Sequence, residues 1–116
     1  MGIGQGDVLV TPLQVAVAYA AIANNGQVLE PQLVYEVRDP EGNVVRRLEP
    51  VVRSRLPVAP EHLAAIRAGL REAVTSGTAR GFVRTTEVPI AGKTGTAEFG
   101  VQDARGQYQT HAWFAA

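Results

Sequence analysis

The chain has 116 residues, of which 46% are hydrophobic and 19% are charged, and its 11 basic residues balance 11 acidic ones. It contains no cysteine. This composition is typical of a globular domain and excludes disulfides and a cysteine nucleophile, and it gives no basic field for nucleic acid. The longest apolar stretch, Val15 to Ala23, is well below the roughly 20 residues of a membrane span. Residues 1–4 have no signal-peptide features, so we expect a soluble chain without direct membrane insertion.

The first predicted element is a helix from Pro12 to about Asn24. Thr11 is a suitable N-cap, Gln14 completes a capping box with it, and Pro12 suits the first helical position. Gly26 can adopt the left-handed conformation that ends many helices. The side chains between are apolar nearly all round, which predicts a helix that is buried on most faces or has lost its partners.

A β-hairpin is expected next, with strands at 33–38 and 44–48. The residues between them, Asp39-Pro40-Glu41-Gly42-Asn43, have the composition of a turn. The proline-containing stretch 49–59 then predicts an extended connector.

Pro60 opens a second helix, which Gly77 ends. Its apolar positions recur at helical spacing, so one face should lie in the core. The residues predicted on that face are Leu63, Ile66, Leu70 and Val74.

Two strands, Val88 to Glu98 and Tyr108 to Ala116, should pair as an antiparallel hairpin. Tyr108, Trp113 and Phe114 are expected to pack on this sheet, and His111 stands alone, without the neighbours that a metal site needs. The chain ends on an apolar run without a turn or cap. We therefore expect an α+β fold in which helices pack on an incomplete antiparallel sheet.

The chain has ten arginines but a single lysine, Lys93, which lies in the segment Gly92-Lys93-Thr94-Gly95-Thr96. An ammonium is a compact, rotatable point charge that can come close to a bound anion. The segment therefore indicates an anion-binding or catalytic site. A phosphate-binding loop is disfavoured, because Glu87 stands where that motif needs a glycine and the glycines after the lysine discourage a helix. Taken alone, the segment is a weak signal and favours an exposed edge strand with one solvated lysine.

The neighbouring segments favour a catalytic family. In chain order they are Gly4-Gln5-Gly6, Thr11-Pro12-Leu13-Gln14, Gly77-Thr78-Ala79, the stretch Ala91 to Glu98 and the stretch His111 to Ala115. Together they resemble the transpeptidase domain of bacterial penicillin-binding proteins of the monofunctional class B. The first and last segments resemble most the elongation-type, penicillin-binding-protein-2-like members.

The resemblance implies part of the penicillin-binding protein and serine β-lactamase-like transpeptidase fold. It implies a peptidoglycan D,D-transpeptidase of the cell wall that works through a serine acyl-enzyme and binds β-lactams, without cofactor or metal. Lys93, Thr94 and Gly95 match the family's Lys-Thr-Gly substrate-binding strand. Thr96 matches the position whose hydroxyl holds the substrate carboxylate and whose backbone N–H completes the oxyanion hole, so Lys93 and Thr96 are the catalytic candidates.

Two motifs of that family have no match in this sequence. One is a serine three residues before a lysine, and the other is a serine two residues before an asparagine. The only serines are Ser54 and Ser76, and neither has the required neighbours. We therefore expect residues 1–116 to be a C-terminal fragment of a transpeptidase domain that lacks the nucleophile-bearing part and is inactive alone.

The implied partners are peptidoglycan stem peptides, β-lactams and the remainder of the domain, with no nucleic acid. Binding of stem peptides and β-lactams is expected to be weak or absent without the missing part. The parent protein is expected to act outside the cytoplasmic membrane, held by an anchor that this chain lacks. The alternative is a non-catalytic structural or interaction module, or half of a split domain. A class A β-lactamase relative is a weaker alternative, because it would not carry the segments around Gly4 and Thr11.

Overall fold

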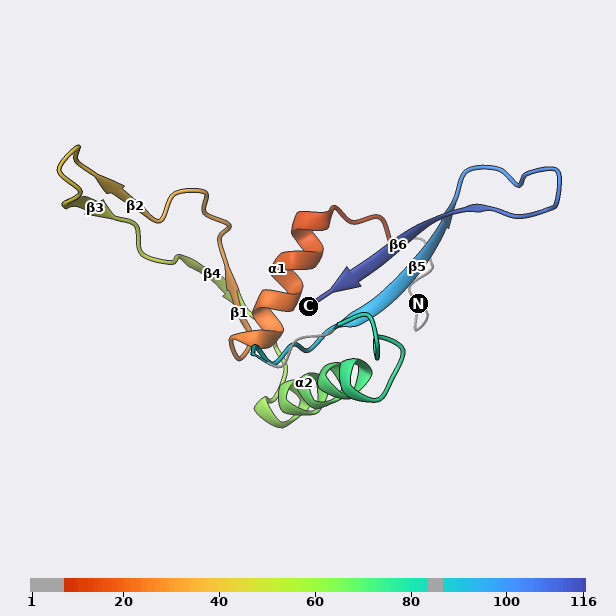
Figure 1. The fold of residues 1–116 in the computed structure, drawn as a ribbon. Helices are drawn as coiled ribbons and strands as arrows, with labels where there is room; N and C mark the ends of the chain where they lie inside the picture. Colours follow the sequence, from red (N-terminus) through yellow and green to blue (C-terminus); the bar gives the residue numbers. More distant parts are fainter. Residues whose placement is uncertain (1–7, 84–86) are drawn as a thin grey trace.

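A computed structural model describes residues 8–83 and 87–116. Within these ranges the chain forms α1 (Pro12–Ala23), β1 (Gln27–Leu29), β2 (Glu36–Arg38), β3 (Val44–Arg47), β4 (Val52–Arg55), α2 (Pro60–Thr75), β5 (Lys93–Phe99) and β6 (Gln109–Ala115). The strands pair as three two-stranded antiparallel sheets, β1–β4, β2–β3 and β5–β6. Figure 1 shows the two helices in the middle and the β2–β3 and β5–β6 hairpins extending to opposite sides. The predicted α+β class is confirmed.

The start and end of α1 follow the sequence prediction. The Gln14 backbone N–H donates to Thr11 Oγ1 at 3.3 Å, and Gln14 Oε1 accepts from the Thr11 N–H at 2.8 Å, which completes the capping box. The helix stops at Ala23, and Asn25 and Gly26 follow with φ of 62° and 86°. These left-handed residues let the Gly26 N–H reach the carbonyl of Ala21 at 2.7 Å.

The extended connector predicted at 49–59 contains a strand that was not predicted, at residues 52–55. These residues form β4, which pairs with β1 and sets Val28 opposite Ser54. The prolines at 50 and 57 bound this short strand instead of preventing it, because neither lies within its ladder. Its partner lies more than 20 residues earlier in the chain, so the local pattern could not reveal the pairing.

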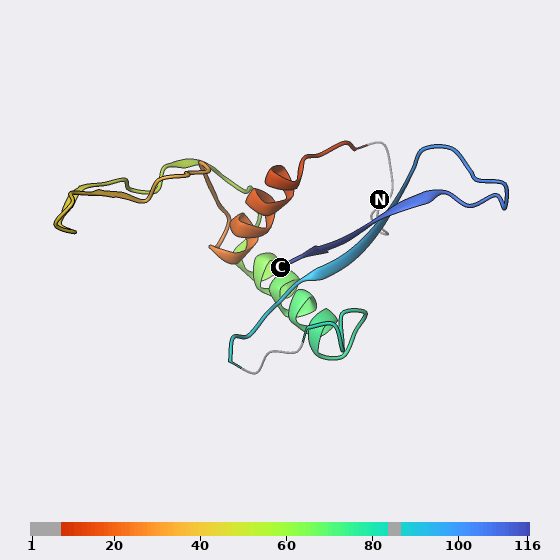
Figure 2. The ribbon, with the colours of Figure 1, turned by 45° about the horizontal axis from the view of Figure 1, so that its top comes forward.

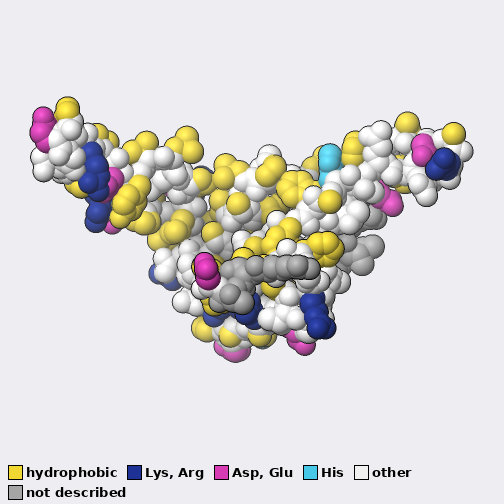
Figure 3. Space-filling model, viewed as in Figure 1, with side chains coloured by type: hydrophobic (Ala, Val, Ile, Leu, Met, Phe, Trp, Pro, Cys, Tyr) yellow, Lys and Arg dark blue, Asp and Glu magenta, His cyan; other side chains and the backbone are white. Residues whose placement is uncertain are grey.

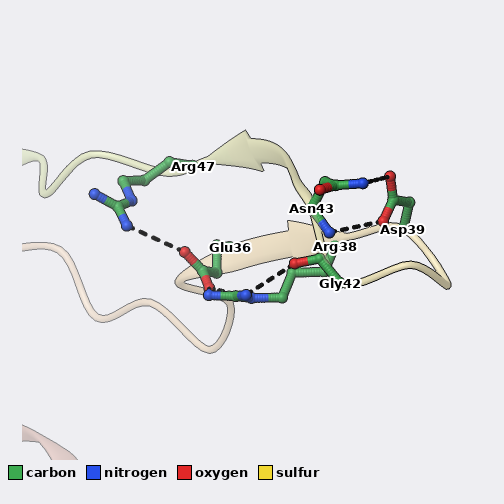
Figure 4. Close-up of polar contacts among 6 residues, drawn as sticks. All are labelled: Glu36, Arg38, Asp39, Gly42, Asn43 and Arg47. Carbon is green, nitrogen blue, oxygen red and sulfur yellow. Dashed lines mark hydrogen bonds and ion pairs between the residues drawn. The ribbon is translucent and has the colours of Figure 1, made fainter.

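The predicted β2–β3 hairpin is confirmed, with shorter strands than expected. Figure 4 shows how its turn is closed: Asp39 accepts hydrogen bonds from Asn43 Nδ2 at 3.0 Å and from the Asn43 backbone N–H at 2.7 Å. These bonds lower the pKa of Asp39 below its ordinary value of 3.8, the side-chain bond being the main cause. Gly42, with φ of 89°, supplies the left-handed turn residue.

Glu36 holds the two strands of this hairpin together across its exposed surface. Its Oε1 accepts from Arg38 Nε at 2.6 Å, and its Oε2 lies 3.3 Å from Arg47 Nη2 (Figure 4). The Arg47 guanidinium also lies over the Tyr35 ring, 5.2 Å from its centroid. The hairpin is therefore ordered by its own polar contacts.

The second helix begins and ends close to the predicted residues, but its buried face is narrower than predicted. Leu63 and Val74 are buried and Leu70 is half-buried, whereas Ile66 is 42% exposed. Among the described residues, α2 packs mainly on α1 and β5, and the part of its apolar face that carries Ile66 is left exposed. Arg67 Nη1 donates to the carbonyl of Ile22 at 2.9 Å, which gives the last turn of α1 a partner.

The core is small for a chain of this length. Among the described residues, the buried hydrophobic side chains are Ala21, Leu63, Val74 and Ala79. The radius of gyration is 18.4 Å, whereas a compact domain of this size has about 13 Å. The chain therefore does not close around one core, as the expected incomplete sheet implies.

Uncovered apolar surface is the counterpart of this small core. The sequence predicted that α1 is either buried on most faces or without its packing partners. Only Ala21 of α1 is buried, which agrees with the second alternative. The prediction that Tyr108, Trp113 and Phe114 pack on the sheet was wrong in degree, since they are 44%, 41% and 43% exposed. A two-stranded sheet offers too few neighbours to cover such rings. Figure 3 shows hydrophobic side chains spread over the central surface.

Both helices contact the β5–β6 hairpin, α1 through β6 and α2 through β5. Figure 2 shows α1 and α2 crossing beside the end of this hairpin that holds the start of β5 and the C-terminus. Among the described residues, the two helices thus support the β5–β6 hairpin at this end. None of the helices in residues 8–83 and 87–116 has the length and apolar character needed to span a bilayer.

Candidate functional site

The segment with the single lysine begins β5 as an extended strand. Lys93 lies opposite Ala115 of β6, Gly95 opposite Trp113, and Thr96 opposite Ala112. A strand in place of a helix after the lysine excludes the phosphate-loop interpretation. Side chains alternate along a strand, so Thr94 and Thr96 share one face and Lys93 shares the other with Gly95.

The predicted strand from Val88 to Glu98 starts too early by five residues and ends one residue too soon. β5 begins at Lys93, because Pro89 has no N–H to donate and the Gly92 N–H is used elsewhere. It donates to the carbonyl of Leu70 in α2 at 3.0 Å. The start of the candidate site is therefore fixed by a helix as well as by β6.

Gly92 is buried where three atoms of the C-terminal residues crowd it. A Cβ at this position would lie 2.5 Å from the Ala115 carbonyl oxygen and 2.9 Å from both Phe114 Cζ and Ala116 Cβ. No side chain fits in this space, so glycine lets the chain pass this close to the end of β6. The structure therefore gives Gly92 a packing role in addition to its place in the motif.

The Lys93 side chain is exposed, and its Nζ donates to the carbonyl oxygen of Thr94 at 2.8 Å. Within residues 8–83 and 87–116, no carboxylate lies at ion-pair distance from this ammonium. A positive charge with one neutral acceptor retains two N–H donors. It can therefore bind an incoming anion.

Thr94 is half-buried, and its Oγ1 lies 3.1 Å from Oγ1 of Thr78, in the turn that follows α2. Thr96 is exposed and its hydroxyl has no such neighbour among the described residues. No role for Thr78 is predicted from the sequence, although Thr78 lies in one of the segments that carry the resemblance. That segment was the available signal, and the spatial contact could not be read from it.

In the described part of the chain, β5 pairs with β6 along one edge and leaves its other edge unpaired. The space around Gly95 is nearly open. A Cβ at this position would have one neighbour within 4 Å, Trp113 Cβ, at an ordinary contact distance of 3.7 Å. An unpaired edge offers backbone N–H and C=O groups to an extended peptide. The arrangement of Lys93, Thr94, Gly95 and Thr96 can thus present backbone, hydroxyl and ammonium groups to one ligand.

The remaining polar candidates lie apart from Lys93. His111 stacks on Phe99, with ring centroids 4.1 Å apart and planes 7° apart, near the far end of the hairpin. The described residues contain no group of three His, Cys, Asp or Glu side chains that could hold a metal ion. Ser54 lies in β4 and Ser76 caps α2, so neither serine belongs to the β5–β6 sheet. The Gly4-Gln5-Gly6 segment lies outside the described residues.

The match to known proteins decides the family. The family model of the penicillin binding protein transpeptidase domain matches residues 1–116. The chain belongs to this family. Penicillin-binding protein 2A of Bacillus subtilis is 39% identical to this transpeptidase-domain chain over 101 residues, which are 83% of the chain and 14% of that protein.

Two further relatives extend the comparison. The peptidoglycan D,D-transpeptidase PbpA of Mycolicibacterium smegmatis is 37% identical over 114 residues, 98% of this chain and 22% of that protein. The structure of penicillin-binding protein 2B from Streptococcus pneumoniae superposes with a TM-score of 0.65 at 29% identity, covering 88% of this chain and 18% of that one. The predicted likeness to penicillin-binding-protein-2-type transpeptidases and the predicted fold are confirmed. This transpeptidase-domain chain spans between 14% and 22% of the length of the curated relatives named here.

Proposed function

We propose that residues 1–116 are a C-terminal part of the transpeptidase domain of a peptidoglycan D,D-transpeptidase, and that β5 is its substrate-binding strand. The observation that carries this proposal is the Lys93-Thr94-Gly95-Thr96 segment, placed on a strand with one free edge in a chain of this family. The uncompensated ammonium of Lys93 and the hydroxyls of Thr94 and Thr96 suit the carboxylate at the end of a stem peptide. β-Lactams, which carry a carboxylate in the same relation to their reactive carbonyl, would occupy the same site.

In the complete domain, a serine outside this chain attacks the carbonyl of the penultimate D-alanine. The Oγ–C bond forms, the peptide bond breaks, and the terminal D-alanine leaves as an amine. A neighbouring amine then displaces the serine and forms the cross-link. This chain contributes the docking edge, the charge of Lys93 beside the reacting groups, and the Thr96 backbone N–H as one oxyanion donor.

The chain alone is proposed to be inactive, because a serine three residues before a lysine is impossible here. Its one lysine is Lys93, and the residue three before it is Ile90. The parent enzyme would act outside the cytoplasmic membrane, held by an anchor in another part of the protein. Its partners would be stem peptides, β-lactams and the remainder of the domain.

Labelling with a fluorescent penicillin tests this proposal. The purified chain should give no covalent band, while full-length penicillin-binding protein 2A of Bacillus subtilis, labelled beside it, should. Intact-mass measurement checks that no adduct forms. A labelled band from the pure chain would show that it carries its own nucleophile and would overturn the fragment proposal.

The second candidate is a non-catalytic module or half of a split domain. The small core and the radius of gyration of 18.4 Å favour the split-domain version over a self-sufficient module. Size-exclusion chromatography and hydrogen exchange separate the two. A monomer with cooperative protection supports a self-sufficient module, and association or weak protection supports a chain that needs a partner.

A further inference from the structure

We propose that Thr78 is a positioning residue for Thr94, and that it prepares the Thr94 hydroxyl to donate to the substrate carboxylate. Thr78 lies in the turn after α2 and Thr94 is the second residue of β5. Their Oγ1 atoms are 3.1 Å apart. The inference rests on the carboxylate-binding role proposed above for β5.

The single proton of each hydroxyl decides which of the two threonines can donate to a ligand. A threonine hydroxyl has one O–H to donate and two lone pairs that accept. If Thr94 donates to Thr78, its proton is used and the approaching anion meets only lone pairs. If Thr78 donates to Thr94, the Thr94 proton stays free and can point at a carboxylate. An anion therefore selects the second arrangement, in which Thr78 is the donor.

The backbone keeps Thr78 in place. The next residue, Ala79, is fully buried, and its N–H donates to the carbonyl of Ala73 at 2.9 Å. The Arg80 N–H donates to the Gly77 carbonyl at 3.0 Å, which closes the turn around Thr78. The turn is thus anchored to the last turn of α2.

The other partner is held equally well, since the Gly92 N–H bonds to the Leu70 carbonyl of the same helix. α2 therefore sets both ends of the Thr78–Thr94 contact. Both side chains are β-branched and have few χ1 rotamers, so the contact loses little entropy when it forms. Lys93 Nζ, bonded to the Thr94 carbonyl at 2.8 Å, adds positive charge next to the prepared hydroxyl.

The first test uses the full 116-residue chain without ligand. Three-bond couplings from the backbone to the Thr94 methyl carbon report its χ1 rotamer by NMR. We expect one rotamer in the unaltered chain and in Thr78→Ser, and averaged couplings in Thr78→Val, which keeps the shape but removes the hydroxyl. Unchanged Thr94 couplings in Thr78→Val would overturn the positioning role, whatever the ligand does. If valine disturbs the turn, Thr78→Ala gives the same comparison.

The second test titrates the same chains with N-acetyl-D-alanyl-D-alanine and with its C-terminal carboxamide, which lacks the charge. The unaltered chain should bind the acid more tightly than the amide. Thr78→Val should weaken binding of the acid about fivefold and leave the amide unchanged, and Thr78→Ser should stay within about twofold of the unaltered chain. A merely structural role would weaken both ligands alike.

The outcomes separate this inference from the proposed function. If the unaltered chain does not prefer the acid, the carboxylate site itself is overturned and the role of Thr78 in it falls as well. If it prefers the acid and Thr78→Val keeps that preference in full, the Thr78 inference is overturned while the proposed function stands.

Discussion

The backbone N–H of Gly92 donates to the carbonyl oxygen of Leu70 at 3.0 Å, and this bond joins the residue before β5 to the middle of α2. The Leu70 carbonyl lies inside the helix and already accepts an intrahelical hydrogen bond. Its second lone pair accepts the additional bond from Gly92. The strand that carries Lys93 is consequently held by α2 at its start and by β6 along its length. The rigidity of the candidate site depends on this junction.

Gly92→Ala should destabilise the chain by about 1–3 kcal/mol, because the new Cβ overlaps the Ala115 carbonyl oxygen and Ala116 Cβ, which move only with the backbone. Denaturant unfolding followed by circular dichroism measures this loss. Gly69→Ala is the matched control, since no atom lies within 4 Å of its Cβ position in α2. It should stabilise the chain by about 0.5–1 kcal/mol through its helix propensity. Equal effects of the two substitutions would contradict the packing account.

Gly95→Ala should separate stability from ligand binding. Its Cβ would meet only Trp113 Cβ at an ordinary 3.7 Å, so the free energy of unfolding should change by less than about 0.5 kcal/mol. Binding of N-acetyl-D-alanyl-D-alanine should weaken several-fold, because the proposed substrate lies against this residue. Titration by NMR measures the second effect. A variant that binds as well as the unaltered chain would argue against β5 as the docking strand.

Thr11→Ala should cost about 1 kcal/mol of stability, because the Gln14 backbone N–H loses its acceptor, Thr11 Oγ1, while the bond from the Thr11 backbone N–H to Gln14 Oε1 can remain. Thr11→Ser keeps the acceptor oxygen and should recover most of the loss. Thermal unfolding of the three chains in one buffer provides the measurement. If serine and alanine were equally destabilising, the capping bond would not be the cause.

The stability of the β2–β3 hairpin should depend on pH through the ionisation of Asp39. The Asn43 bonds lower the pKa of Asp39 in the folded chain. The stability that the ionised Asp39 gives to the folded hairpin is therefore fully present above the ordinary pKa of 3.8. The contribution is lost as the pH falls through the folded pKa, because a protonated carboxyl accepts these bonds poorly. Carboxyl chemical shifts followed by NMR should show a midpoint below 3.8, and Asn43→Ala should move it upward. An Asp39 midpoint that Asn43→Ala leaves in place would contradict the assigned cause.

Local signals in the sequence were sufficient for elements whose boundaries depend on nearby residues. The Thr11–Gln14 capping box and the left-handed residues after Ala23 define α1, and the 39–43 turn defines the β2–β3 hairpin. Long-range pairing was not accessible in this way. β4 depends on β1 for its existence, and no local pattern of residues 52–55 identifies that partner.

The same distinction holds for the candidate site. Residues 93–96 are candidates because their types and order match the family's motif, and the structure places them consecutively on β5. Thr78 could not be assigned, because its contact with Thr94 arises from the turn after α2 and from the Gly92–Leu70 bond. The burial of Ile66, Trp113 and Phe114 was overestimated, since apolar character in the sequence does not say whether a neighbour is present to cover it.

The most direct test of the account is a chimera in which this chain replaces the matching stretch of Bacillus subtilis penicillin-binding protein 2A, to which it is 39% identical. We expect the chimera to be labelled by a fluorescent penicillin, because the host supplies the serine and this chain supplies β5. Lys93→Ala and Lys93→Arg in the chimera should slow labelling at least about tenfold, which corresponds to about 1.4 kcal/mol in the barrier. Labelling of a folded Lys93→Ala chimera at the unaltered rate would contradict the proposal that β5 is the substrate-binding strand.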